Sequence, residues 1–365
     1  IQEDEIKKAY DDTSDEMKRV IHISYDRITK YHKMQVEKSW MHYEDNGNIL
    51  GQKVTPLDRV GLYVPGGKAA YPSSLLMNAI PAIVAGVKEI IVVSPTPNDE
   101  INPLVLATAY ICNITKIYKM GGASAIGALA YGLEDLKAVD MISGPGNAYV
   151  ASAKKMVFGI LNIDMIAGPS EIGIIADENA NIDYICADLL SQAEHDELAR
   201  SILVTHSQEV ADKVAKRIYE QLDNLNRKEI AKISIDNEAI IIISESLEQS
   251  IEVMNKIAPE HLEILTKNPF ELLASIKHAG AIFLGENTPE PIGDYIAGAN
   301  HTLPTSGSAR FFSPLSVQNF MKKSSIIYFS KQGMNELGAE TIMFAKDEGL
   351  DAHAKSIEYR MKSKQ

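Results

Sequence analysis

The chain has 365 residues, of which 45% are hydrophobic and 23% charged, and its formal net charge is −13. This length exceeds what one hydrophobic core usually supports, so we expect two or more domains. The acidic balance argues against nucleic acid as a partner, because binding the phosphate backbone requires positive charge. With 2 cysteines a disulfide framework is excluded. No apolar run reaches the roughly 18 residues of a membrane helix. We therefore expect a soluble, cytoplasmic protein without a membrane partner.

The first part of the chain shows two successive patterns. Residues 1–45 are charged and helical in pattern, whereas from residue 59 short apolar strands alternate with helices. Strands are predicted at 59–64, 90–93, 116–118 and 139–142, and helices at 73–87, 102–112 and 123–131. This alternation predicts a mostly parallel sheet with helices on both faces.

A second series of the same kind follows from residue 171. Strands are predicted at 171–176, 202–205, 240–243, 262–266 and 281–284, and helices at 182–194 and 209–222. From Ile326 a strand leads into helices across 331–362. We therefore predict an α/β fold of two incomplete Rossmann-like parallel-sheet domains with helical N- and C-terminal extensions. The expected boundaries are 1–55 for the N-terminal extension, 56–165 and 166–320 for the two α/β domains, and 321–365 for the C-terminal strand and helices.

The end of the predicted helix 182–194 carries a possible pair of metal ligands. Gln192 and His195 are three residues apart, so both face the same side of the helix. An amide oxygen and an imidazole nitrogen on one face are suitable ligands. The alternative is a solvated helix end, because histidine is favourable in a last turn.

Glu260 and His261 are adjacent and offer two proton carriers near neutral pH. Neighbouring residues on a regular strand face opposite ways, so these two share a site only on irregular backbone, which Pro259 favours. A surface turn with a local ion pair is an equal alternative.

Two further segments combine small residues with groups that bind ligands. The small residues of 291–301 let a loop approach a ligand closely, with Asp294 and His301 directed inward. Glu348 and His353 flank a short break between the two C-terminal helices. Both segments also fit ordinary turn and helix-cap chemistry.

Three turns of small residues could meet a phosphate group. Gly144-Pro-Gly-Asn147 follows a predicted strand and opens a helix, so its amides could face an anion. The turns at 64–67 and 167–170 are of the same kind, but none matches the dinucleotide fingerprint. The residues alone thus indicate a metal-dependent α/β enzyme and identify neither cofactor nor substrate.

Taken in order, these stretches resemble the histidinol dehydrogenase family. The matching stretches are 61–67, 121–123, 144–147, 167–171, 191–195, 259–261, 293–295, 300–301 and 303–305. So many stretches in one order with matching spacing make the resemblance specific over roughly residues 55 to 360. It implies oxidation of L-histidinol to L-histidine in two steps, each of which reduces one NAD.

The resemblance also implies roles for individual residues. One zinc ion per site would be bound by Gln192, His195, Asp294 and His353. The substrate would meet these four ligands, the general base His261, and Ser170, His301 and Glu348. Glu260 would activate the water that hydrates the bound aldehyde. NAD would contact Tyr63, Ser124 and Asn147, although Ser124 stands where the family usually has glutamine. The first α/β domain would thus bind the cofactor, and the second would hold the metal and the acid/base residues.

The resemblance implies an intertwined homodimer with shared active sites. The C-terminal helices would dock on the partner subunit, so Glu348 and His353 would serve the neighbouring site. Two other functions stay open: a dehydrogenase of another small polar alcohol, such as a sulfonated diol, and a non-catalytic zinc-binding homologue.

Overall fold

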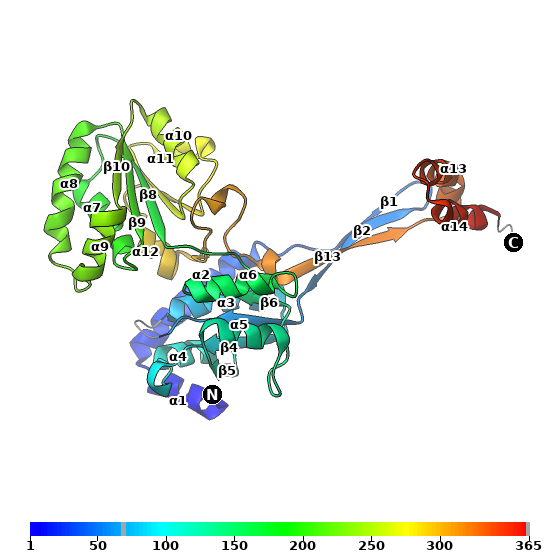
Figure 1. The fold of residues 1–365 in the computed structure, drawn as a ribbon, viewed down its shortest axis with the longest axis horizontal. Helices are drawn as coiled ribbons and strands as arrows, with labels where there is room; N and C mark the ends of the chain where they lie inside the picture. Colours follow the sequence, from blue (N-terminus) through cyan, green and yellow to red (C-terminus); the bar gives the residue numbers. More distant parts are fainter. Residues whose placement is uncertain (67–70, 363–365) are drawn as a thin grey trace. The chain divides into compact units, whose positions relative to one another are not determined.

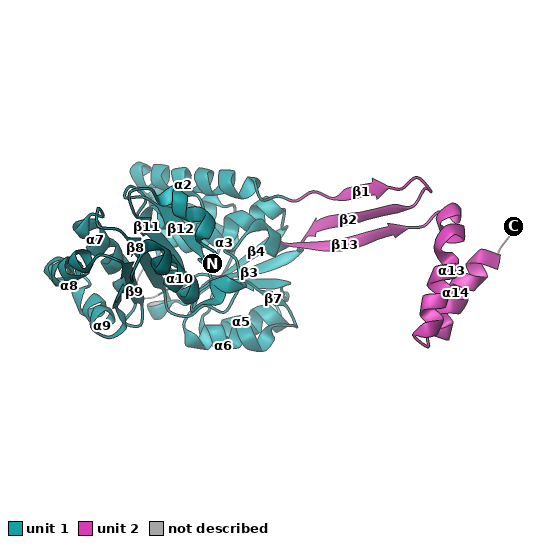
Figure 2. Cartoon of the chain, turned by 90° about the horizontal axis from the view of Figure 1, so that it is seen from above, with its two compact units in different colours: residues 1–36, 57–320 teal, residues 37–56, 321–365 magenta. Residues whose placement is uncertain are grey.

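The structure is a computed structural model that describes residues 1–66 and 71–362, so Gly67 of the stretch 61–67 lies outside the described residues. The chain forms two compact units (Figure 2). Unit 1 comprises residues 1–36 and 57–320, and unit 2 comprises residues 37–56 and 321–365. None of the described helices is long and apolar enough to cross a membrane.

The first sheet of unit 1 has the strand order β5-β4-β3-β6-β7, and its neighbouring strands pair in parallel. Among these strands β3 comes first in the chain, and it lies in the middle of the sheet, so the connections leave it in both directions. In sheets of this topology ligands bind at the carboxyl ends of the two strands where the direction changes, which here are β3 and β6. The strands are β3 (Arg59–Tyr63), β4 (Glu89–Ser94), β5 (Lys116–Lys119), β6 (Met141–Ser143) and β7 (Asn162–Ile163).

Helices pack on both faces of this sheet. Tyr63, Ile91 and Val93 form a buried cluster with α5 and α6. Side chains alternate along a strand, so the buried Val60 and Leu62 face the opposite side, where α3 contacts β3. The helices are α3 (Pro72–Ala85), α4 (Pro103–Ile111), α5 (Gly122–Tyr131) and α6 (Ala148–Val157), with the short turn η1 (Pro97–Asp99) before α4.

The second sheet has the order β10-β9-β8-β11-β12 and is also parallel. Its strands are β8 (Glu171–Ala176), β9 (Arg200–Thr205), β10 (Ile240–Ile243), β11 (His261–Leu265) and β12 (Ala281–Leu284). Helices α7 (Ile182–Ala193), α8 (Gln208–Leu222) and α9 (Lys228–Glu238) cover one face, and α10 (Leu247–Ile257) covers the other (Figure 1). The predicted α/β fold with two parallel sheets is confirmed.

Short elements lie between β11 and β12 and after β12, and two N-terminal helices pack on α3 and α4 beside the first sheet. The short elements are α11 (Pro269–Leu272), η2 (Leu273–Ser275), α12 (Glu290–Ile292), η3 (Gly293–Ala297), η4 (Ser308–Arg310) and η5 (Val317–Phe320). Helix α1 (Glu3–Asp12) packs against α4, and α2 (Asp15–Lys33) packs against α3 and η3. The Ser24 hydroxyl of α2 donates to the Tyr295 carbonyl at 2.6 Å, so α2 supports the segment that carries Asp294.

Unit 2 is an antiparallel sheet followed by two helices. Its strand order is β1-β2-β13, with β1 (Trp40–Tyr43), β2 (Ile49–Pro56) and β13 (Met321–Tyr328), and its helices are α13 (Lys331–Asp347) and α14 (Asp351–Lys362). The expectation that residues 1–55 form a helical extension is wrong for β1 and β2. Each residue of β2 pairs with one of β13, which lies far away in sequence, and local periodicity does not report such a partner.

Candidate active site

Glu260 and His261 are brought together by an irregular backbone just before β11. Ala258 ends α10 with a left-handed φ of 52°, and the chain then turns through Pro259 into the strand. Both residues bind the main chain of Glu171 on the neighbouring strand β8. His261 Nδ1 lies 3.0 Å from the Glu171 carbonyl oxygen, and Glu260 Oε2 accepts from the Glu171 amide at 3.0 Å. Glu260 Oε2 and His261 Nδ1 are therefore only 3.8 Å apart.

The contact with Glu171 determines which nitrogen of His261 is the base. A carbonyl oxygen only accepts, so Nδ1 carries the proton and Nε2 has the free lone pair. Nε2 is buried and has no hydrogen-bond partner among the described residues. Burial lowers the pKa of His261, with the nearby Asp294 opposing this shift, so the neutral imidazole is favoured. Burial also raises the pKa of Glu260 well above its usual value.

A group of possible metal ligands lies beside His261 Nε2. Nitrogen and oxygen atoms of His195, Glu290 and Asp294 all lie within 4.8 Å of one another. Glu290 Oε1 is 3.8 Å and Asp294 Oδ1 is 3.9 Å from His261 Nε2, so these possible ligands and the imidazole of His261 lie at one place. Gln192 is 1% exposed and lies on the last turn of α7, where its carbonyl accepts from the His195 amide at 3.2 Å.

The fit of this group to a metal can be tested on its buried atoms. Gln192 Oε1 and Glu290 Oε1 are buried, and neither has a hydrogen-bond partner within the described part of the chain. A buried oxygen without a partner is costly, and a cation satisfies it. Imidazole nitrogen and carboxylate or amide oxygen are donors that zinc accepts. The donor set therefore fits zinc.

Glu290 was not among the residues singled out in the sequence. It precedes Asp294 by four residues at the start of the short helical segment formed by α12 and η3. Two acids at this spacing face the same side of a helix, which is the signal that the sequence offered. Pro289 and Pro291 obscured this four-residue spacing, because a segment rich in proline and turn residues is seldom expected to be helical.

Two further predicted residues lie near this group. His301 Nε2 is buried and lacks a hydrogen-bond partner in the ranges that the structure describes. Its loop is fixed by Asn300, whose amide donates to the Met77 carbonyl of α3 at 2.6 Å and whose Oδ1 accepts from the Thr302 amide. Ser170 directly precedes β8, and its carbonyl accepts from the Arg200 amide at 2.9 Å.

Glu348 and His353 belong to unit 2. Glu348 is the C-cap of α13, and His353 lies in the first turn of α14. Both are exposed within the described chain. Of the four predicted metal ligands, His195 and Asp294 belong to the ligand group of unit 1, and Gln192 lies on the same helix turn as His195.

The three predicted cofactor residues lie at the carboxyl edge of the first sheet. Tyr63 ends β3, and its hydroxyl accepts from the Gly122 amide at 3.1 Å. Ser124, in the first turn of α5, donates to the Gly121 carbonyl. Asn147 caps α6, with Oδ1 accepting from the amides of the second and third helix residues. These residues lie at the edge of the sheet where doubly wound sheets bind ligands.

The turn after β6 is fixed by a buried ion pair. The Gly144 carbonyl accepts from Lys154 Nζ at 3.0 Å, and its amide donates to Asp164 Oδ2 at 2.8 Å. Lys154 and Asp164 also pair with each other, and both side chains are at most 5% exposed. Gly144 has a φ of +117°, and a Cβ there would lie 2.1 Å from the Tyr63 carbonyl oxygen. The turn is therefore built for close approach of backbone to backbone or to a ligand.

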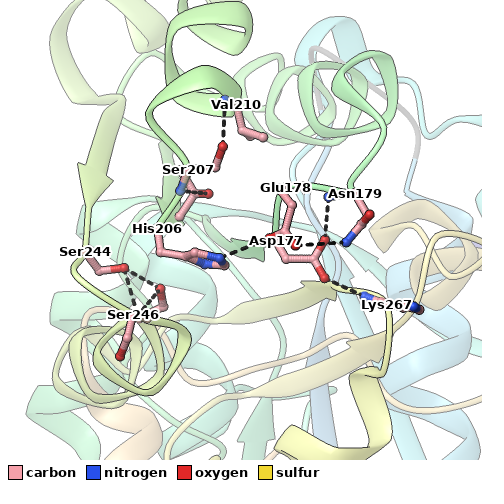
Figure 3. A network of polar contacts seen from close by, with 11 residues as sticks. Asp177, Glu178, Asn179, His206, Ser207, Val210, Ser244, Ser246 and Lys267 are labelled. Atoms are coloured by element: carbon pink, nitrogen blue, oxygen red, sulfur yellow. Dashed lines mark hydrogen bonds and ion pairs between the residues drawn. The ribbon is translucent and has the colours of Figure 1, made fainter.

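The carboxyl edge of the second sheet carries a different kind of network (Figure 3). Asp177, after β8, accepts from the amides of Asn179 and Lys267, and Glu178 lies 3.1 Å from His206 Nε2. Ser207 Oγ accepts from the Val210 amide and caps α8. These groups are used in turns and helix caps, whereas the unpartnered atoms described above gather near the opposite, amino ends of β8 and β11.

Comparison with known proteins gives one consistent result. A family model described as histidinol dehydrogenase matches residues 1–361. The histidinol dehydrogenase of Wolinella succinogenes is 60% identical over 356 residues, 98% of this chain and 82% of that protein. That of Helicobacter hepaticus is 60% identical over 359 residues, again 98% of this chain and 82% of that protein. The crystal structure of histidinol dehydrogenase from Elizabethkingia anophelis superposes with a TM-score of 0.96 at 38% identity, covering 100% of this chain and 84% of that one.

Proposed function

The chain belongs to the histidinol dehydrogenase family, and we propose that it oxidises L-histidinol to L-histidine in two NAD-dependent steps at a zinc-containing site. The observation that carries this proposal is the arrangement of His261. Its Nδ1 proton is engaged by the Glu171 carbonyl, and its free Nε2 faces the space beside His195 and Asp294. A buried base next to a set of metal donors suits the oxidation of an alcohol.

In the first step His261 Nε2 takes the hydroxyl proton of the substrate as a hydride leaves the same carbon for NAD. The Glu171 carbonyl keeps the ring in the tautomer that presents Nε2. Once protonated, the imidazolium has Glu290 and Asp294 within 4 Å of Nε2, and these carboxylates offset part of the cost of its buried charge.

In the second step water adds to the aldehyde, and the hydrate loses a hydride to a second NAD. Glu260 is placed to handle the proton of that water, because its carboxyl group lies 3.8 Å from the His261 ring. Its raised pKa reflects burial and makes it a better proton acceptor when it is ionised. The two proton carriers are both hydrogen-bonded to the main chain of Glu171, one to its amide and one to its carbonyl group.

Gln192, His195 and Asp294 would hold the zinc ion from within one chain, and His353 would complete the set from the partner. When bound, zinc would orient the substrate through its imidazole and amino nitrogens. Ser170 and His301 would surround the substrate, and Glu348 of the partner would meet its ammonium group. Tyr63, Ser124 and Asn147 would contact NAD at the carboxyl edge of the first sheet.

A homodimer with shared sites accounts for the exposed apolar surface of unit 2. Large apolar side chains that are more than half exposed include Trp40, Met41, Tyr43, Ile327, Tyr328, Met343, Phe344 and Tyr359. An apolar surface of this kind is typical of a protein–protein interface. The two-subunit site also predicts that dissociation removes His353 and Glu348 together.

The test is to mix the protein with NAD and L-histidinol and to follow NADH while the product is identified. The expected result is two NADH per histidine, lost after chelation and restored by zinc. His261→Asn is the matched control, because the asparagine amide can still donate to the Glu171 carbonyl while the base is removed. Turnover of another polar alcohol without any turnover of histidinol would contradict the proposal.

A further inference from the structure

Glu290 is an acid whose surroundings do not explain its burial. It is 2% exposed at the start of α12. Its amide donates to Glu263 Oε1 at 2.7 Å, and its Oε2 accepts from the Ser191 hydroxyl at 3.3 Å. Its other oxygen, Oε1, has no hydrogen-bond partner among the residues described. Such an oxygen is unfavourable unless a cation or a ligand meets it.

The free oxygen points toward the ligand group. Ligand atoms of Glu290, His195 and Asp294 lie within 4.8 Å of one another, a spacing that one ion can bridge. Glu290 Oε1 is also 3.8 Å from His261 Nε2. Buried Gln192 Oε1, on the same turn as His195, is a second oxygen without a partner. The spacing of the triad and the unpartnered oxygens of Glu290 and Gln192 together indicate a site for a cation.

The charges around Glu290 lead to the same conclusion. Its closest charged neighbours are carboxylates: Asp294 within the triad, and Asp188 and Glu263 behind it. A divalent cation would offset the repulsion among these carboxylates, because it favours the ionised form of every carboxylate that it contacts. The cluster is therefore better suited to a bound metal than to an empty core.

We propose that Glu290 is a metal ligand of the substrate-free enzyme, so that one chain offers four ligands of its own, Glu290 beside Gln192, His195 and Asp294. This inference rests on the zinc site of the proposed function and adds a residue to it. It implies that one chain would hold the metal without His353 of the partner subunit. Glu290 Oε1 lies 3.8 Å from His261 Nε2, so the same carboxylate would also face the protonated His261.

The experiment titrates Co²⁺, as a spectroscopic probe for zinc, into the metal-free protein without substrate. Four proteins are compared: the unaltered chain, Glu290→Gln, His353→Ala and the double variant. Asp188→Asn is the matched control, since Asp188 is a buried carboxylate of α7 outside the triad. Affinity is measured by equilibrium dialysis, and ligation by the visible d–d absorption of Co²⁺. Glu290→Asp, which shortens the carboxylate, replaces Glu290→Gln if that variant does not fold.

We expect Glu290→Gln to weaken Co²⁺ binding by at least about 10-fold and to change the visible spectrum, whereas Asp188→Asn, which removes a nearby charge outside the triad, leaves the spectrum unchanged. His353→Ala should still bind one ion, and the double variant should lose it. Affinity within twofold of the unaltered chain would overturn the inference. A weaker affinity with an unchanged spectrum would also overturn it, because charge alone would explain the loss. If the unaltered chain binds no metal, both the zinc site of the proposed function and this inference fail. If the unaltered chain binds Co²⁺ and Glu290→Gln binds it equally well, only this inference fails.

Discussion

Replacing Lys154 by methionine is expected to destabilise the protein and to weaken NAD binding. Lys154 is 4% and Asp164 5% exposed, so the substitution leaves a buried carboxylate without its cation. Removing one partner of a buried pair costs about 3–5 kcal/mol. Asp164 keeps two amide donors, Gly144 at 2.8 Å and Met165 at 2.7 Å, which offset part of this loss. We therefore expect a loss near the lower limit, about 3 kcal/mol.

Urea unfolding at a fixed protein concentration measures this loss, and steady-state kinetics measures the consequence for the site. Lys154 and Asp164 bind both main-chain groups of Gly144 and so hold the turn that leads to Asn147, one of the proposed NAD contacts. The KM for NAD should therefore rise, while the KM for histidinol changes little. The double variant Lys154→Met with Asp164→Asn removes both charges and should recover most of the stability. A loss below about 1 kcal/mol in the single variant would refute the dependence of Asp164 on Lys154.

Three further predictions concern the second sheet. His261→Asn should lower kcat roughly 10²- to 10⁴-fold with little change in the unfolding midpoint, since the base is lost and the donor is kept. Burial raises the pKa of Glu263 to about 9. The protonated acid therefore stabilises the fold at low pH, and this contribution declines as pH rises from about 4.5 toward 9. Glu263→Gln should flatten that decline in urea titrations at successive pH values, and an unchanged slope would contradict the assignment. Gly280→Ala should cost about 1–3 kcal/mol, because its Cβ would lie 2.5 Å from the Glu260 carbonyl oxygen. Gly127→Ala in α5, where no atom of the described chain lies within 4 Å of a Cβ, should instead stabilise by about 0.5–1 kcal/mol in thermal unfolding.

The order of strands and helices in unit 1 was readable from the sequence because local patterns encode it. Apolar runs such as 172–175 mark strands that are buried on both faces, as found in β8. Asn147 and Ser207 cap the helices that follow them through contacts within three residues. The predicted strands 171–176, 240–243 and 281–284 coincide with β8, β10 and β12.

The candidate site was predicted through the family resemblance rather than through local chemistry. Each motif by itself also fitted a turn, a cap or a surface ion pair. Gln192 and His195 share a helix turn, so their proximity follows from helical spacing. Nothing local indicated that Asp294, about a hundred residues later, lies within 4.8 Å of a ligand atom of His195.

Only the tertiary structure decided which distant residues meet. The Glu171 carbonyl fixes the tautomer of His261 and the Glu171 amide binds Glu260, although about 90 residues separate them in sequence. The pairing of β2 with β13 and the inclusion of Glu290 in the ligand group have the same origin. Sequence periodicity specifies which face of an element is buried, because that depends on neighbours within a few residues. Which other element covers that face depends on the packing of the whole chain, and that packing created the site.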